Sequence, residues 1–303
     1  MSSDLNTDAR LPMPALAHRT GCRCALHGRR LFGAGLLATV ATPLQAQDGL
    51  RDEVGRTSRL AKLVPAEEVE QAAAQQYAQM LRDARAQRAL APADHPQLQR
   101  LRFIAERIIP YSHGWNDRAR QWRWEVNLIG SKEVNAFCMP GGKIGFYYGI
   151  LQRLQLTDDE VAMIMGHEVA HALREHARER MGKSAATRLG AGLLSSLFGL
   201  GGIGDAVLNM GGQLLTLKFS RDDESEADIV GLDLAARAGY DPQAGVTLWQ
   251  KMGRLQDGAP PPFLSTHPSG PSRIQDIESR LPKVMPLYGA AARPPRRFGP
   301  PPA

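Results

Sequence analysis

The sequence predicts an α+β domain that is mostly α-helical and carries a small β-sheet. Several segments repeat apolar residues at helical spacing, and two of them open with a capping box, a pattern typical of a helix start. One segment alternates apolar and polar residues as a strand does, and two more strand-like segments follow it around a Pro-Gly-Gly turn. The 303 residues, 43% of them hydrophobic and 22% charged, suffice for one sizeable globular domain with appendages.

The first two helices are indicated by composition and by apolar spacing. Residues 65–90 are rich in Ala, Gln, Glu and Arg, which favours a surface helix. Residues 96–109 repeat apolar side chains at helical spacing, among them Leu101 and Ile104, and we expect this helix to stop before Pro110.

A longer helix is expected to begin after Thr157. Thr157 and Glu160 have the spacing of a capping box, and the acidic residues between them suit the positive end of a helix dipole. We expect that helix to run to about Met181.

A second capping box links Ser220 with Asp223, and the helix that it opens should end near Gly239. Further helices are expected from Asp241-Pro242 onward and over residues 271–281.

The small sheet is predicted from three short segments. Residues 122–128 alternate, so that Trp122, Trp124, Val126 and Leu128 would share one face of a strand. Residues 135–139 and 143–148 form a hairpin pattern around the turn Pro140-Gly141-Gly142.

The N-terminal segment has the three-part form of an export signal. Residues 29–47 (RRLFGAGLLATVATPLQAQ) combine a basic start, a moderately apolar run and a small residue at Ala46. We therefore expect residues 1–46 to be a signal peptide, with Arg29-Arg30 resembling a twin-arginine signal. The alternatives are a general secretory signal and an uncleaved anchor. The expected location is the periplasm, with membrane association left open.

The remaining organisation follows from composition. We expect one domain over residues 47–282 and a Pro- and Arg-rich disordered tail over 283–303. The net charge of +6 lies partly in the predicted signal and the tail, so it gives no case for nucleic-acid binding. Two of the three cysteines lie in the signal, which leaves Cys138 alone and excludes a disulfide framework within the mature chain.

One motif predicts a metal centre. Residues 167–171 read HEVAH, and two histidines four residues apart lie on the same side of a helix, so both imidazoles can bind one metal ion. Glu168 is offset from that face and is placed to act as a general base on the attacking water. His167 and His171 with Glu168 therefore predict a hydrolytic zinc site, with one Zn²⁺ per chain.

The third protein ligand has to come from another element. Glu224 and Asp228 are four residues apart at the start of the next capped helix, so one can bind zinc while the other accepts a hydrogen bond from a ligand histidine. We expect Glu226 to face solvent. His176 would lie on the opposite side of a continuous helix from His167, which predicts a structural role.

The sequence resembles peptidase family M48, the gluzincin zinc metallopeptidases. The resemblance rests on NAFCMPGG (135–142), GHEVAHALREH (166–176), FSRDDESEADIVGLDLAARAGYDP (219–242) and STHPSGPSRI (265–274), in the order that the family has them. It implies a zincin-like metalloprotease domain of the minimal exported branch, with a sheet edge near the site helix. It also implies that Glu224 is the third ligand and that Asp228 is the acid behind the ligand histidine.

Further expectations concern the surroundings of the site. His267 is a candidate catalytic residue, as an oxyanion donor with Arg273 in support or as a latch on the fourth metal position. The alternative is a loop residue before Pro268 that takes no part in the chemistry. Asn135, Ala136 and Phe137 are expected to bind substrate as an added strand. The Gly-rich segment 189–217 could cover the site as a plug or touch a membrane.

These features predict a zinc-dependent metalloendopeptidase that cleaves misfolded or envelope proteins. Its expected partners are polypeptide substrates and no nucleic acid, with contacts at a membrane surface or in outer-membrane assembly left open. The alternatives are a periplasmic chaperone or binding protein that uses the same cleft with little proteolysis, and membrane-anchored signalling proteolysis with an uncleaved leader.

Overall fold

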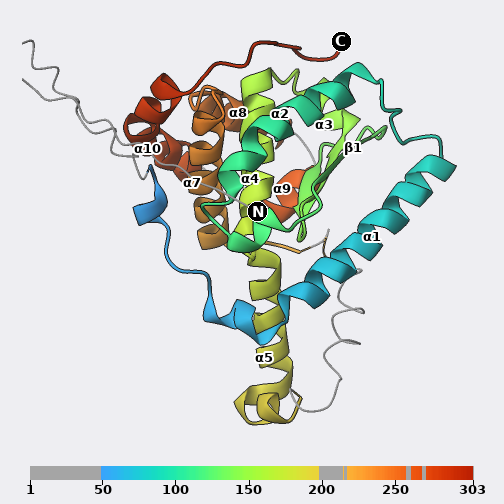
Figure 1. The fold of residues 1–303 in the computed structure, drawn as a ribbon, viewed down its shortest axis with the longest axis vertical. Coiled ribbons are helices and arrows are strands. Elements are labelled where there is room, and N and C mark those ends of the chain that lie inside the picture. Colours follow the sequence, from blue (N-terminus) through green and yellow to red (C-terminus); the bar gives the residue numbers. More distant parts are fainter. Residues whose placement is uncertain (1–48, 198–213, 215–216, 257–260, 268–270, 303) are drawn as a thin grey trace, which may run out of the picture. The chain divides into compact units, whose positions relative to one another are not determined.

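Helix α4 (Asp158–Leu173) is the central element of the fold (Figure 1). The computed structural model describes residues 49–197, 214, 217–256, 261–267 and 271–302. The predicted capping box is present, because Thr157 Oγ1 accepts from the Glu160 amide and the Glu160 carboxylate accepts from the Thr157 amide. Every residue of α4 except Asp159 is buried. Helices α2, α7 and α8 and strand β2 all pack against it.

Helix α7 (Arg221–Arg237) crosses α4 in direct backbone contact. A side chain added at Gly166 would meet the carbonyl oxygen of Gly231 at 2.8 Å, and one added at Gly231 would meet the amide nitrogen of His167 at the same distance. Only glycine permits this approach. The first turn of α7 opens with the predicted capping box of Ser220 and Asp223. The close crossing brings that turn beside His167 and His171 of α4.

A three-stranded mixed sheet lies on another side of α4. Its order is β1-β3-β2, where β1 (Glu125–Ile129) pairs with β3 (Lys143–Tyr147) in parallel and β2 (Ala136–Met139) pairs with β3 antiparallel. The predicted hairpin is confirmed, with Gly141 and Gly142 in its turn at φ +81° and +76°. The first strand begins later than predicted, since Trp122 and Trp124 precede it.

The remaining described helices surround the α4–α7 pair and the sheet. Helix α1 covers the sheet, where the Tyr77 hydroxyl donates to the carbonyl of Ile144 at 2.6 Å. These helices are α1 (Ala66–Ala86), α2 (Pro96–Ser112), α3 (Tyr148–Arg153), α5 (His176–Leu197), α8 (Ala244–Gly253), α9 (Pro262–Thr266) and α10 (Pro271–Ala290), with 3₁₀ turns η1 (Arg51–Glu53), η2 (Arg59–Leu63), η3 (Asp117–Arg120) and η5 (Arg254–Gln256). Among the described helices, none has the length and apolar content to cross a bilayer.

The predicted helix from Thr157 to Met181 is wrong as a single element. Helix α4 ends at Leu173, Glu175 adopts a left-handed conformation with φ +59°, and α5 begins at His176. The chain changes direction at Glu175, so the residues of α5 do not continue the faces of α4.

The predicted disordered tail is also wrong for residues 283–302. Helix α10 continues to Ala290 because Val284 and Leu287 extend its buried face, while Pro282 and Pro286 lie on its exposed face, where freed carbonyls can bond water. Beyond it, the Phe298 amide donates to Asp158 at 2.7 Å. The predicted signal peptide lies outside the described residues, as does most of the predicted plug over 189–217.

Candidate metal centre

Four buried side chains from three elements converge on one point. His167 and His171 come from the last two turns of α4, Glu224 from the first turn of α7, and His267 from the end of α9. Each offers one ligand atom, and the four atoms lie within 4.8 Å of one another. The α4–α7 crossing therefore joins the two parts of the sequence that were predicted to supply metal ligands.

The spacing of the ligand atoms fits a tetrahedral zinc site. His167 Nε2 lies 3.0 Å from His171 Nε2. Glu224 Oε2 lies 3.5 Å from His167 Nε2, and Glu224 Oε1 lies 3.4 Å from His171 Nε2. Ligand atoms about 2.0–2.1 Å from a tetrahedral ion would be about 3.3 Å apart. The structure thus brings together the residues predicted as the ligand set, His167, His171 and Glu224.

Glu168 lies at the cluster with one carboxylate oxygen free of hydrogen bonds. Its side chain is buried, and its Oε1 has no hydrogen-bond partner among the described residues, with His267 Nε2 3.6 Å away. Burial raises the pKa of the Glu168 carboxyl above its usual value. An acceptor that is buried and unpartnered beside a metal-ligand set suits a proton acceptor for an incoming water molecule.

Asp228 and Arg273 support the ligands from behind. Asp228 Oδ1 lies 2.9 Å from His167 Nδ1, which fixes the ring with Nε2 toward the cluster. Arg273 donates to Glu224 at 2.6 Å and to both oxygens of Asp228, and its guanidinium stacks 3.6 Å over the Trp249 ring. The contacts agree with the role predicted for Asp228. Arg273 also contacts Glu224 directly.

The electrostatics of the cluster favour the forms that bind a metal. Burial lowers the pKa of His171 well below its usual value, so the ring is neutral. Burial alone would raise the pKa of Glu224, but the imidazoles of His171, His267 and His167 packed around its carboxylate outweigh that effect and hold the pKa below its usual value. A neutral imidazole and a carboxylate are the protonation states that zinc requires of its ligands.

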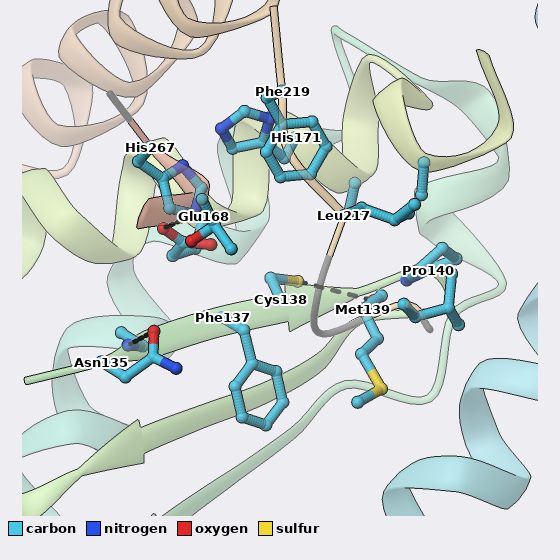
Figure 2. Close-up of a pocket in the computed structure, with 15 residues that line it drawn as sticks. Asn135, Phe137, Cys138, Met139, Pro140, Glu168, His171, Leu217, Phe219 and His267 are labelled. Atoms are coloured by element: carbon cyan, nitrogen blue, oxygen red, sulfur yellow. Dashed lines mark hydrogen bonds and ion pairs between the residues drawn. The ribbon is translucent and has the colours of Figure 1, made fainter. Parts of the chain in front are cut away.

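A pocket opens between the cluster and strand β2 (Figure 2). Glu168, His171 and His267 face it from one side, and the segment from Asn135 to Pro140 forms the other. The rest of its wall is mainly apolar, formed by Ala172, Ala177, Leu214, Leu217 and Phe219. In the sheet that the described residues form, β2 is an edge strand, and its residues line the pocket.

The sequence profile of Peptidase family M48 matches residues 92–281, well over half of the chain. The matched range contains all four residues of the cluster and Glu168. The chain belongs to peptidase family M48. The zincin-like M48 domain with a small sheet, predicted from the sequence, is thereby confirmed.

The relatives that this M48 chain matches are named as proteases. Mitochondrial metalloendopeptidase OMA1 of Arabidopsis thaliana is 42% identical over 150 residues, which cover 50% of this chain and 30% of that protein. Metalloprotease LoiP of Escherichia coli is 30% identical, covering 63% of this chain and 73% of LoiP. The Beta-barrel assembly-enhancing protease of Escherichia coli is 29% identical, covering 53% of this chain and 35% of that protein.

The chain therefore carries a metal-dependent peptidase domain, a hydrolase of peptide bonds. It spans only about a third of the Arabidopsis protein and of the Beta-barrel assembly-enhancing protease. The alternative of a chaperone with little proteolysis finds no support in these comparisons.

Sequence reasoning missed one part of the M48 site. His176 was expected on the far side of α4 and Glu226 in solvent, but His176 Nδ1 lies 2.9 Å from His171 Nδ1 and Glu226 is half-buried beside His176. Both expectations fail because the chain turns at Glu175. The segment Leu173-Arg174-Glu175 contains neither glycine nor proline, so no residue in it signals the turn.

Proposed function

We propose that the chain is a zinc-dependent endopeptidase that hydrolyses extended polypeptides bound along β2. The observation that carries the proposal is the tetrahedrally spaced set of His167, His171 and Glu224 beside Glu168, whose Oε1 has no hydrogen-bond partner among the described residues. Bound zinc would supply Lewis acidity, polarising the scissile carbonyl and acidifying the attacking water.

Glu168 is the general base of this proposal. Its buried Oε1 accepts a proton from the attacking water. Burial raises the pKa of the Glu168 carboxyl toward neutral pH, where a general base is most effective. The protonated carboxyl then delivers the proton to the leaving amine. Because the same side chain acts in both steps, its loss should affect turnover far more than metal binding.

The substrate chain is proposed to add to the free edge of β2. Asn135, Ala136 and Phe137 belong to the segment that borders the pocket, and edge-strand pairing holds a peptide by its backbone with little sequence preference. The apolar wall formed by Ala172, Leu217 and Phe219 favours an apolar substrate side chain next to the scissile bond. Misfolded polypeptides, which expose such side chains in extended segments, are the substrate class that fits.

The cellular setting is also a proposal. The signal pattern of residues 1–46 supports export to the periplasm. The similarity to the Beta-barrel assembly-enhancing protease supports envelope proteins as substrates and contacts in outer-membrane assembly. N-terminal sequencing of the protein recovered from its cell would test the export, with a first residue near position 47 as the expected result.

Glu168→Gln tests the catalytic assignment. Metal content measured on the purified variant should equal that of the wild type, because Glu168 is not in the ligand set. Peptide cleavage should fall by roughly 10²–10⁴, the contribution of a general base. Glu278→Gln, an exposed acid on α10, is the matched control and should keep full activity. Wild-type turnover by purified Glu168→Gln would overturn the assignment.

A further inference from the structure

The ring of His171 is held on two sides by side chains that the ligand motif does not include. Its Nδ1 lies 2.9 Å from His176 Nδ1, and its face stacks on Phe219 with centroids 4.0 Å apart. His176 Nε2 in turn lies 3.4 Å from Glu226 Oε2, and Arg174 donates to the same oxygen at 2.9 Å. His171, His176 and Glu226 thus form a continuous chain of polar contacts leading away from the cluster.

The tautomers along this chain follow from the position of His171 Nε2. That atom faces His167 Nε2 and Glu224, so a ligand role requires its lone pair there and leaves the proton on Nδ1. His171 Nδ1–H must then donate to His176 Nδ1. A neutral His176 carries its own proton on Nε2, which is the atom that faces the Glu226 carboxylate.

The two ligand histidines are therefore supported in different ways. His167 meets the carboxylate of Asp228 directly, whereas His171 reaches the carboxylate of Glu226 through a second imidazole. His176 is 1% exposed, so its nitrogens have little access to water and depend on these two partners. In a continuous helix, a residue five positions after His171 would point about 140° away from it; the left-handed Glu175 removes that obstacle.

We infer that His176 is a positioning residue for the ligand His171 and that Glu226 anchors it. This inference rests on the proposed metal site. Outer-shell partners of ligand histidines fix the ring and its tautomer, and their loss lowers metal affinity by about 10–100-fold. The series of polar contacts from Glu226 through His176 to His171 predicts a loss of zinc affinity of that size when His176 is replaced. The loss should be smaller when Glu226 is replaced, because Glu226 lies one contact further from His171.

The test measures zinc affinity by competition with a chromophoric chelator, together with the visible spectrum of the Co²⁺-substituted protein. His176→Leu keeps the bulk and removes the acceptor, and we expect its zinc dissociation constant to rise about 10–100-fold. His176→Asn places an oxygen near the former Nδ1, so it should restore most of the affinity and the wild-type Co²⁺ spectrum. Glu226→Ala should weaken binding by less than His176→Leu. Glu179→Gln, an acid in the first turn of the same helix, should leave affinity unchanged.

The outcomes separate this inference from the proposed function. If the wild type binds no zinc or Co²⁺, the proposed metal site itself fails. If the wild type binds zinc and His176→Leu binds it equally well, or if His176→Asn is as weak as His176→Leu, the positioning role is overturned. If His176→Leu does not fold, the other two variants decide. The inference is contradicted if Glu226→Ala binds zinc as tightly as the wild type while His176→Asn binds it at least tenfold more weakly.

Discussion

His267 raises a question at the scale of a single residue, because its side chain could occupy the fourth metal position at rest or stabilise the oxyanion. Its Nδ1 lies 3.0 Å from Glu224 Oε1 and 3.3 Å from His167 Nε2, distances that match those between the three proposed ligands. This geometry favours the latch over the oxyanion donor, because the imidazole stands where a fourth ligand would stand. Both roles remain proposals for this chain.

His267→Ala distinguishes the two roles. If the imidazole restrains the site, its removal should raise basal cleavage of an unstructured peptide several-fold, and this is the result we expect. Loss of an oxyanion donor would instead lower cleavage by about 10²–10³. His113→Ala, at the end of α2 and outside the cluster, controls for a general effect of histidine loss. A decrease, or an unchanged rate, in His267→Ala would reject the latch.

Residue types and spacing alone predicted His167 and His171 as the proposed ligands and Glu168 as the proposed base. They could not choose between Glu224 and Asp228 as the third ligand, because both lie on one face of α7. In the structure the two carboxylates meet different atoms: Glu224 faces the Nε2 atoms of His167 and His171, while Asp228 faces Nδ1 of His167. This difference supports Glu224 as the proposed third ligand. That difference depends on how α7 lies across α4, which local sequence does not encode.

At the scale of elements, the polar contacts from His171 through His176 to Glu226 depend on the turn at Glu175. A left-handed conformation costs a residue other than glycine about 1–3 kcal/mol. Glu175→Gly removes that strain together with the ion pair that Glu175 makes with Arg178. We therefore expect the substitution to be neutral or slightly stabilising in chemical denaturation.

Glu179→Gly is the matched comparison. It also removes an ion pair, with Lys183 at 2.5 Å, but from a helical position, where glycine costs about 1 kcal/mol. The free energy of unfolding should thus be lower for Glu179→Gly than for Glu175→Gly by about 1–2 kcal/mol. Equal stabilities, or a less stable Glu175→Gly, would show that the backbone at Glu175 is not strained.

Helix starts were predictable because capping boxes are local, and both Thr157–Glu160 and Ser220–Asp223 form as expected. Helix ends were not, because they depend on tertiary packing. Helix α4 stops at Leu173 without a breaker, whereas α10 runs past Pro282 because its buried face continues to Leu287. The same dependence explains why the tail predicted as disordered packs near Asp158 instead.

At the scale of the whole described domain, the site concentrates negative charge in the interior. Glu168, Glu224 and Asp228 are grouped with one guanidinium, that of Arg273. Burying carboxylates without enough positive charge opposes folding, and a divalent cation at the cluster would offset it. Metal binding and the stability of the fold should therefore be coupled, since α4, α7 and α9 each contribute to the cluster.

Metal removal should consequently lower the thermal stability of the domain. A ligand present at 1,000 times its dissociation constant stabilises the folded state by about 4.1 kcal/mol. For a domain of this size, each kcal/mol shifts the melting temperature by roughly 2–4 °C, which predicts a fall of roughly 8–16 °C in excess chelator. Differential scanning calorimetry with zinc and with chelator measures this fall in melting temperature.

Glu224→Gln removes a proposed ligand and one buried charge, so its melting temperature should respond much less to the chelator than that of the wild type. If both proteins shifted equally, the stabilising metal would lie elsewhere; if neither shifted, the cluster would not couple metal binding to the fold.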